Sequence, residues 1–159
     1  MSDINENDPL GFDNFDPNEV DTSRPVIPAG DHVMRVKSLE VKESKKDPTK
    51  RNLCVTFETV SAVSLPDGRQ INPGFLLSKY YPLQQSDNPA APDFRVDLTR
   101  LIDGVLGTSR GDRPDLRAAV GLMQGRETCV SLIVRKPKPG SEEELYGDSN
   151  EIRKLSPIL

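Results

Sequence analysis

The chain contains few of the residues that metal centres, disulfide frameworks and membrane spans require. Only two of its 159 residues are cysteines, and Cys54 and Cys129 lie far apart without the paired spacing of a zinc site or disulfide framework. We expect both to be reduced core thiols. The longest apolar runs, such as Val130–Val134, are far too short to span a bilayer. Acidic residues follow Met1 where a secretory signal needs basic and then apolar residues, so we expect a cytoplasmic protein.

Catalytic motifs are equally scarce. The single histidine, His32, lies in an alternating strand pattern, which is more typical of a hydrogen-bonded strand residue than of a catalytic base. There is no Walker-type glycine loop, no HExxH sequence and no nucleophile elbow. The acid pair Asp93 and Asp97 fits a helix face, and the run Glu142–Glu144 fits a solvated loop, so neither indicates a magnesium site. We predict that the protein is not an enzyme and uses no metal or cofactor.

The charge of the chain is unevenly distributed. Its formal net charge is −4, yet residues 1–23 hold seven acidic residues and no lysine or arginine. The other 136 residues therefore carry 18 acidic and 21 basic residues, a net charge of +3. This asymmetry is typical of an acidic regulatory tail attached to a basic binding domain. The simpler alternative is a tail that only keeps the protein soluble. We expect residues 1–28 to be disordered or ordered only by a partner, and residues 29–159 to form one domain.

The first strand pattern contains a phase slip. His32, Met34 and Val36 share one face, and Leu39 and Val41 then continue in the opposite phase. A slip inside one strand indicates a β-bulge, which would bend the strand so that it serves both halves of a closed sheet.

The other elements follow from apolar spacing and turn residues. Further strands are expected at Leu53–Phe57, Phe75–Tyr81, Glu127–Lys136 and Glu151–Leu155, with a turn at Leu65–Arg69. Helical spacing predicts a helix from Phe94 to Val105 and a second from Pro114 to Met123, with Asp112 as a cap.

Three strands, a helical insertion and two more strands are the order of an OB (oligonucleotide/oligosaccharide-binding) barrel. A five-stranded α+β sandwich would give the same order. The bent first strand favours the barrel. We therefore predict a mainly β fold, a five-stranded OB-like barrel with a helical insertion between strands 3 and 4.

Two segments carry a resemblance to a known family. Residues 28–60, PAGDHVMRVKSLEVKESKKDPTKRNLCVTFETV, and the closing NEIRKLSP resemble the phage single-stranded DNA-binding proteins of the OB-fold type. In that family a Gly-led first strand ends in a Ser/Lys-rich turn, and a late Asn-x-Ile precedes a basic pair and a proline. The resemblance implies sequence-tolerant binding of single strands in replication or recombination, in the cytoplasm of an infected bacterium. One departure is the ending KLSPIL, where such proteins often carry an acidic tail with a terminal aromatic residue.

Single-strand binding needs cations along a groove and flat side chains on which bases stack. The candidate cations form two groups, one in the first hairpin and one around the last two strands. These groups are Lys42, Lys45, Lys46, Lys50 and Arg51, and Arg135, Lys136, Lys138, Arg153 and Lys154. In an OB barrel the corresponding loops flank one binding face, so we expect the two groups to converge. Either group alone would fit an ordinary solvated turn.

Stacking candidates are few, because aromatic residues make up only 5 % of the chain and tryptophan is absent. They are Tyr80, Tyr81 and Phe75 on the third strand and Tyr146 in the loop between the fourth and fifth strands. Since neighbours in a strand face opposite sides, at most one of Tyr80 and Tyr81 can meet a base, and the other must be core.

These observations lead to a functional prediction with one alternative. We predict sequence-tolerant binding of single-stranded DNA, or of RNA, by phosphate neutralisation and base stacking. A replication or recombination protein would be recruited through the acidic N-terminal tail, no membrane would be contacted, and the oligomeric state stays open. The alternative is an OB-like or β-sandwich structural or protein-interaction module, for instance for a virion or a host factor, with no nucleic-acid ligand.

Overall fold

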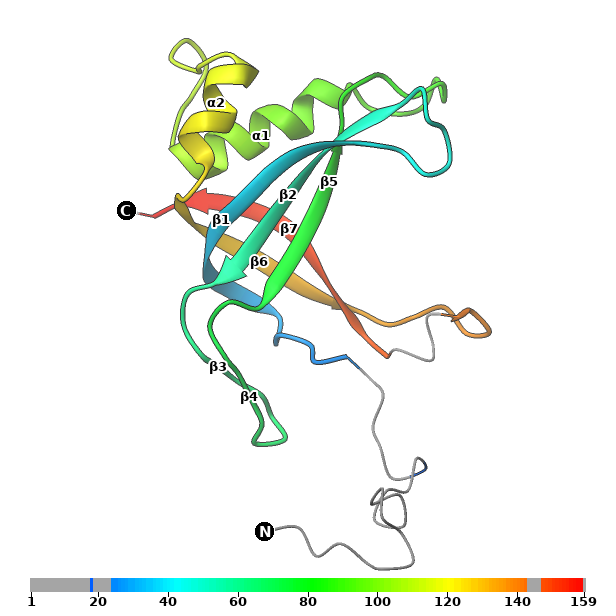
Figure 1. The fold of residues 1–159 in the computed structure, drawn as a ribbon, viewed down its shortest axis with the longest axis vertical. Coiled ribbons are helices and arrows are strands. Elements are labelled where there is room, and N and C mark those ends of the chain that lie inside the picture. Colours follow the sequence, from blue (N-terminus) through cyan, green and yellow to red (C-terminus); the bar gives the residue numbers. More distant parts are fainter. Residues whose placement is uncertain (1–17, 19–23, 143–146, 159) are drawn as a thin grey trace, which may run out of the picture.

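The computed structural model describes Asn18, residues 24–142 and residues 147–158. Its main feature is a five-stranded antiparallel sheet in the order β5-β2-β1-β6-β7 (Figure 1). The strands are β1 (Gly30–Glu43), β2 (Arg51–Thr59), β3 (Val63–Ser64), β4 (Gln70–Ile71), β5 (Leu76–Pro82), β6 (Glu127–Arg135) and β7 (Ser149–Pro157), and the helices are α1 (Phe94–Leu106) and α2 (Leu116–Met123). The predicted mainly β architecture with a helical insertion is confirmed.

The strand β1 joins the two halves of the sheet. Its first half, Gly30–Arg35, pairs with β6, whereas Met34–Glu43 pairs with β2. The register with β2 shifts between Val36 and Ser38, so Lys37 is an extra residue in the ladder. The predicted bulge is confirmed, and β1 bends strongly along its length (Figure 1).

The inward faces of the strands form the core. In β2 the side chains of Leu53, Val55 and Phe57 are at most 2 % exposed, as their alternation predicts. Cys54 lies on the opposite face of β2, beside Tyr80 of β5 in the register, and is nevertheless 4 % exposed. Neither cysteine forms a disulfide within the described residues, and Cys129 is half-buried.

Each helix begins at an aspartate. Asp93 caps α1, and Gly107, with a φ of 72°, ends it in the left-handed conformation. Asp115 caps α2 by accepting a hydrogen bond from the backbone N–H three residues on, at 2.8 Å. The prediction that Asp112 caps this helix is wrong, because Asp112 Oδ1 instead accepts a hydrogen bond from the N–H of Ser109 at 2.7 Å.

The helix α1 packs closely on the end of β7. A Cβ atom on Gly104 would lie 2.6 Å from the Cβ of Leu155, so only glycine permits this approach. The buried hydroxyl of Thr128 on β6 lies within hydrogen-bond distance of two carbonyl oxygens, 3.1 Å from that of Gly104 and 2.8 Å from that of Ser156, and shares its one hydrogen between them. These contacts join α1 to β6 and β7.

The sheet does not close into a barrel within the described residues, contrary to the prediction. The edge strands are β5 and β7, and no ladder pairs them. We call the space between these two strands the seam. Because α1 contacts both edge strands, helix packing takes the place of strand pairing there.

The chain has a hairpin that the prediction did not include, so the strand count along the chain differs. The predicted turn at Leu65–Arg69 closes this separate hairpin of β3 and β4, and the helices therefore follow the fifth strand of the chain and not the third, although they lie between the segments expected as strands at Phe75–Tyr81 and Glu127–Lys136. Each strand of this hairpin has two residues, which is too short to produce a periodic apolar pattern.

The chain joins the folded domain before the predicted boundary at residue 28. Ile27 is fully buried, its N–H donates to Asn150 Oδ1 at 2.9 Å, and Asn150 Nδ2 donates to its carbonyl oxygen at 2.8 Å. The segment 24–28 therefore belongs to the domain, whereas residues 1–17 and 19–23 of the predicted tail lie outside the described residues. In the described part of the chain, no helix has the length and apolar character needed to span a membrane.

Candidate nucleic-acid interface

The loop between β1 and β2 presents its cations on a hydrogen-bonded turn. The N–H of Ser44 donates to the carbonyl oxygen of Lys50 at 2.8 Å, and the N–H of Lys50 donates to that of Asp47 at 3.0 Å. The carboxylate of Asp47 accepts from the hydroxyl and the N–H of Thr49 at 2.6 and 3.0 Å, and these two bonds lower the pKa of Asp47. The backbone that carries the hairpin lysines is therefore held at its base and at its tip.

Two of the five hairpin cations are paired with carboxylates. Lys50 Nζ lies 3.0 Å from Asp87 Oδ2, and Lys42 Nζ lies 3.8 Å from Glu40 Oε2. The others make no ion pair within the described residues, and they are Lys45, Lys46 and Arg51. We call these three residues the free hairpin cations, because they can meet a phosphate without first losing a partner.

The two neighbouring tyrosines of β5 have opposite environments, as predicted. Tyr81 is 3 % exposed and belongs to the core, and this burial, with a smaller effect from the charge of Asp97, raises the pKa of Tyr81 well above its usual value. Tyr80 is 56 % exposed on the other face. Tyr80 can therefore offer a ring face to a base, whereas the ring of Tyr81 cannot. Tyr146 lies outside the described residues.

Tyr80 lies close to the base of the hairpin. In the ladder between β2 and β5, Tyr80 is opposite Cys54 and Pro82 is opposite Asn52, the second residue of β2. At about 3.4 Å per residue, Tyr80 lies roughly 7 Å along the strand from Pro82. The exposed ring and the free hairpin cations therefore lie at the same end of the β2–β5 pair.

The second group of predicted cations is divided between two places. Arg135, Lys136 and Lys138 line an open hollow of about 970 Å³ at the β6–β7 loop, together with Arg24. The guanidinium of Arg135 is paired with the carboxylate of Glu151. This hollow has a cationic rim, but one of its charges is already neutralised.

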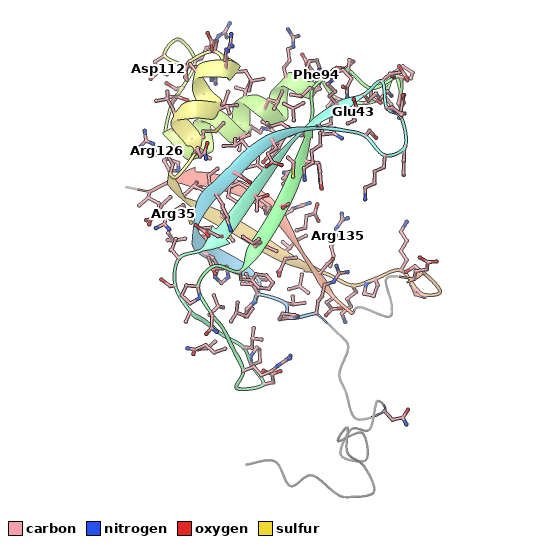
Figure 2. The ribbon with its side chains drawn as sticks, in the orientation of Figure 1. Arg35, Glu43, Phe94, Asp112, Arg126 and Arg135 are labelled. Carbon is pink, nitrogen blue, oxygen red and sulfur yellow. The ribbon has the colours of Figure 1, made fainter. Side chains whose placement is uncertain are left out.

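The hairpin and the β6–β7 loop do not converge. The strand β1 runs from Gly30, which pairs with Leu132 of β6, to Glu43 at the hairpin, and Arg135 lies beyond Leu132. Figure 2 accordingly shows Glu43 near the top of the molecule and Arg135 well below it. The predicted convergence is wrong, because antiparallel pairing with β1 carries the end of β6 away from the hairpin.

Arg153 and Lys154 lie elsewhere, in a groove of about 640 Å³ at the seam. Tyr81 also lines this groove, and two further cations line it that the sequence analysis missed, Lys79 and Arg100. Lys79 lies two residues before Tyr81 on the same strand, so alternation places both side chains on the inward face of the sheet. This alternation is the sequence signal that could have identified Lys79. Arg100 reaches the groove only because α1 docks on β7, and no local pattern shows this.

The described residues contain no group of three or more His, Cys, Asp or Glu side chains placed to hold a metal ion. The predicted acid pair on α1 has a structural use, because Asp93 caps the helix and accepts from Arg95 Nη2 at 2.7 Å. These hydrogen bonds from Arg95, side chain first and then backbone, lower the pKa of Asp93 to about 2. His32 Nε2 lies at hydrogen-bond distance, 2.8 Å, from the carbonyl oxygen of Pro28, which suits a structural strand residue.

Comparisons with known proteins give no further assignment. The chain matches no model of a protein family and no curated protein sequence. The resemblance to phage single-stranded DNA-binding proteins therefore stays a prediction, and the functional argument depends on the geometry described above.

Proposed function

We propose that this protein binds single-stranded DNA without strong sequence preference, by phosphate neutralisation and limited base stacking. The observation that carries the proposal is the position of one exposed ring, Tyr80, at the same end of the β2–β5 pair as the free hairpin cations. Cations of this kind follow a phosphate backbone, and an aromatic face stacks with any base because every base has a π-face.

The architecture supports the same proposal. We infer an OB-type arrangement, left open at the seam, from the strand order β5-β2-β1-β6-β7 around a bent first strand. Proteins of this type bind oligonucleotides on the face of their second and third strands, with the loop between the first two strands and the loop between the last two. In this chain β2, β5 and the β1–β2 hairpin lie together, whereas the β6–β7 loop lies away from them. On this proposal the protein acts in phage replication or recombination, in the cytoplasm of the bacterial host.

The geometry also limits the expected affinity. One stacking platform contributes about 1–3 kcal/mol. Three free cations that each neutralise one phosphate give a log–log salt slope of roughly −2, at about −0.7 per contact. We therefore expect moderate, salt-sensitive binding, unless neighbouring molecules bind cooperatively along the strand.

A second candidate is a protein-interaction module whose basic hairpin meets an acidic partner. The observation in its favour is that Lys42, Lys50 and Arg135 are already paired with carboxylates, which reduces the charge offered to a polyanion. This candidate needs no exposed ring on the sheet and predicts no affinity for a nucleic acid.

The deciding experiment is fluorescence anisotropy with labelled oligo(dT) and the full chain. We expect binding that weakens at least roughly 16-fold between about 50 and 200 mM salt, because the free hairpin cations alone give a slope of roughly −2 over this fourfold change in concentration and any further phosphate contact makes the slope steeper. Circular dichroism at both salts controls for folding. A folded protein that fails to bind at the lower salt contradicts the proposal and favours the interaction module.

A further inference from the structure

The proposed binding surface, which consists of the free hairpin cations and the exposed ring of Tyr80, does not include the cationic groove at the seam. Its basic side chains come from three elements: Lys79 from β5, Arg100 from α1, and Arg153 and Lys154 from β7. None of these four residues belongs to β1, to β2 or to the hairpin that joins them. The groove is therefore a third cationic feature, beside the hairpin and the hollow at the β6–β7 loop, and it requires its own account.

Two consecutive basic residues line this groove at a bulge in β7. The register with β6 places Ile152 opposite Leu132 and Lys154 opposite Ser131, so Arg153 is an extra residue in the ladder. In a regular strand, neighbouring side chains point to opposite faces. A bulge re-aims side chains, and here both Arg153 and Lys154 line the same groove.

The groove keeps a net positive charge after its carboxylates are counted. Two acidic residues line it, Asp97 and Asp103, against four basic ones. Asp103 is engaged by Arg113, with Nη2 2.8 Å from Oδ2. Asp97 lies 4.0 Å from Arg100, at the limit of an ion pair, and the side chain of Arg100 is 78 % exposed and free to move.

The floor of the groove offers hydrogen-bond donors. The Nζ of Lys79 lies 5.2 Å from the ring centroid of Tyr81 and donates weakly to the carbonyl oxygen of Ile152 at 3.4 Å. In the described part of the chain, Lys79 has no carboxylate partner and the hydroxyl of Tyr81 has no hydrogen-bond partner. Both groups can therefore donate to an incoming acceptor.

We propose that the seam groove binds a phosphate group, supplied by the bound strand. Phosphate oxygens accept hydrogen bonds, and Lys79, Arg100, Arg153 and Lys154 can only donate them. A volume of about 640 Å³ lies within the range of small-molecule sites, so the phosphate can enter with its sugar. The phosphate is an internal diester or a terminal monoester.

The edge strand β5 lies between the groove at the seam and the sheet face that carries the exposed ring of Tyr80. Lys79 and Tyr80 are consecutive residues, one facing the groove and the other facing outward. Because β5 is an edge strand, a nucleic acid that stacks on Tyr80 can pass round that edge into the seam. The identity of the ligand rests on the proposed function, but the phosphate chemistry of the groove does not.

The test compares two double variants that each remove two positive charges. R153Q/K154Q alters the groove, and R110Q/R117Q is the control, because Arg110 and Arg117 are exposed and lie outside the groove. Affinity and salt slope are measured with oligo(dT) that has or lacks a 5′-phosphate. We expect R153Q/K154Q to weaken binding roughly tenfold at low salt and to reduce the slope by about 1.4, the value for two lost contacts. The control should bind like the parent protein.

The outcomes separate the seam from the proposed function. A loss confined to the 5′-phosphorylated strand identifies a terminal monoester, and an equal loss on both strands identifies a diester. If R153Q/K154Q is folded and matches the control, the seam proposal is overturned while strand binding stands. R100Q provides a second test should the double variant not fold.

If the parent protein binds neither form of oligo(dT), the proposed function is overturned. Phosphate binding by the groove is then tested separately, by titration with inorganic tripolyphosphate. We then expect amide chemical-shift changes at residues 79–81 and 152–155 in ¹H–¹⁵N spectra, and their loss in R153Q/K154Q. A parent protein whose shifts do not change there overturns the seam proposal as well.

Discussion

The side chain of Lys79 spans the two free edges of the sheet, since its Nζ on β5 donates to the carbonyl oxygen of Ile152 on β7 at 3.4 Å. Exposed edge strands invite pairing with other chains, and proteins commonly protect them with charged side chains or a covering helix. Both devices occur at this seam, where α1 packs against the edge strands. The same arrangement leaves a basic groove between them.

The first prediction concerns the free hairpin cations. K45E/K46E should weaken binding to oligo(dT) of every sequence alike and reduce the salt slope by about 1.4, because two phosphate contacts are lost and the reversed charges repel the strand. The matched control is R110E/R117E, which reverses two exposed charges away from the hairpin. Unchanged affinity in a folded K45E/K46E protein would remove the hairpin from the interface.

The second prediction separates the two tyrosines of β5. Tyr80→Ala should weaken strand binding by about 1–3 kcal/mol with little loss of stability, because it removes an exposed stacking ring. Tyr80→Phe keeps the ring face and should bind normally. Tyr81→Ala should instead lower the free energy of unfolding by roughly 3–5 kcal/mol, the usual cost of removing a large buried ring.

Anisotropy and urea unfolding measure these two effects independently. If Tyr80→Ala binds as tightly as the parent protein, β5 does not supply the stacking platform.

The third prediction concerns the contact of α1 with β7. Gly104→Ala should destabilise the protein by about 1–3 kcal/mol, because the added Cβ would lie 2.6 Å from the Cβ of Leu155 and 2.7 Å from its carbonyl oxygen. Gly121→Ala in α2 is the control, since its added Cβ meets no atom within 4 Å and alanine favours a helix by about 0.5–1 kcal/mol. Urea unfolding of both variants checks the prediction, and equal stabilities would mean that α1 can shift away from β7 at little cost.

The fourth prediction concerns the acidic N-terminal tail. Seven carboxylates in residues 1–23 can compete with phosphates for a cationic surface, and tethering keeps their effective concentration near the millimolar range. The same segment contains two aromatic residues, Phe12 and Phe15, and in this hypothesis one of their rings stacks on Tyr80 in place of a base. Deleting residues 1–23 should therefore tighten oligo(dT) binding several-fold at low salt, and the gain should fade at high salt through screening. Equal affinities with and without the tail, at both salts, would show that the tail only keeps the protein soluble.

Local pattern was sufficient for much of this fold. The phase slip between Val36 and Leu39 located the bulge in β1, because a bulged residue moves every following side chain to the other face. Strand alternation likewise required Tyr80 and Tyr81 to face opposite sides. The same reasoning could have found the second bulge, since the inward residues Ile152 and Leu155 are three positions apart.

Only the tertiary structure decided which cations share a surface. Strand period and helical spacing are set by neighbours a few residues apart, so the sequence by itself determined the five long strands, the two helices and their buried faces, but not the two-residue strands β3 and β4. Whether β5 and β7 meet, and whether Arg100 of α1 faces Arg153 of β7, depends on how elements distant along the chain pack together. The predicted convergence of the hairpin with the β6–β7 loop failed for this reason, and the groove at the seam became apparent only once α1 was placed on β7.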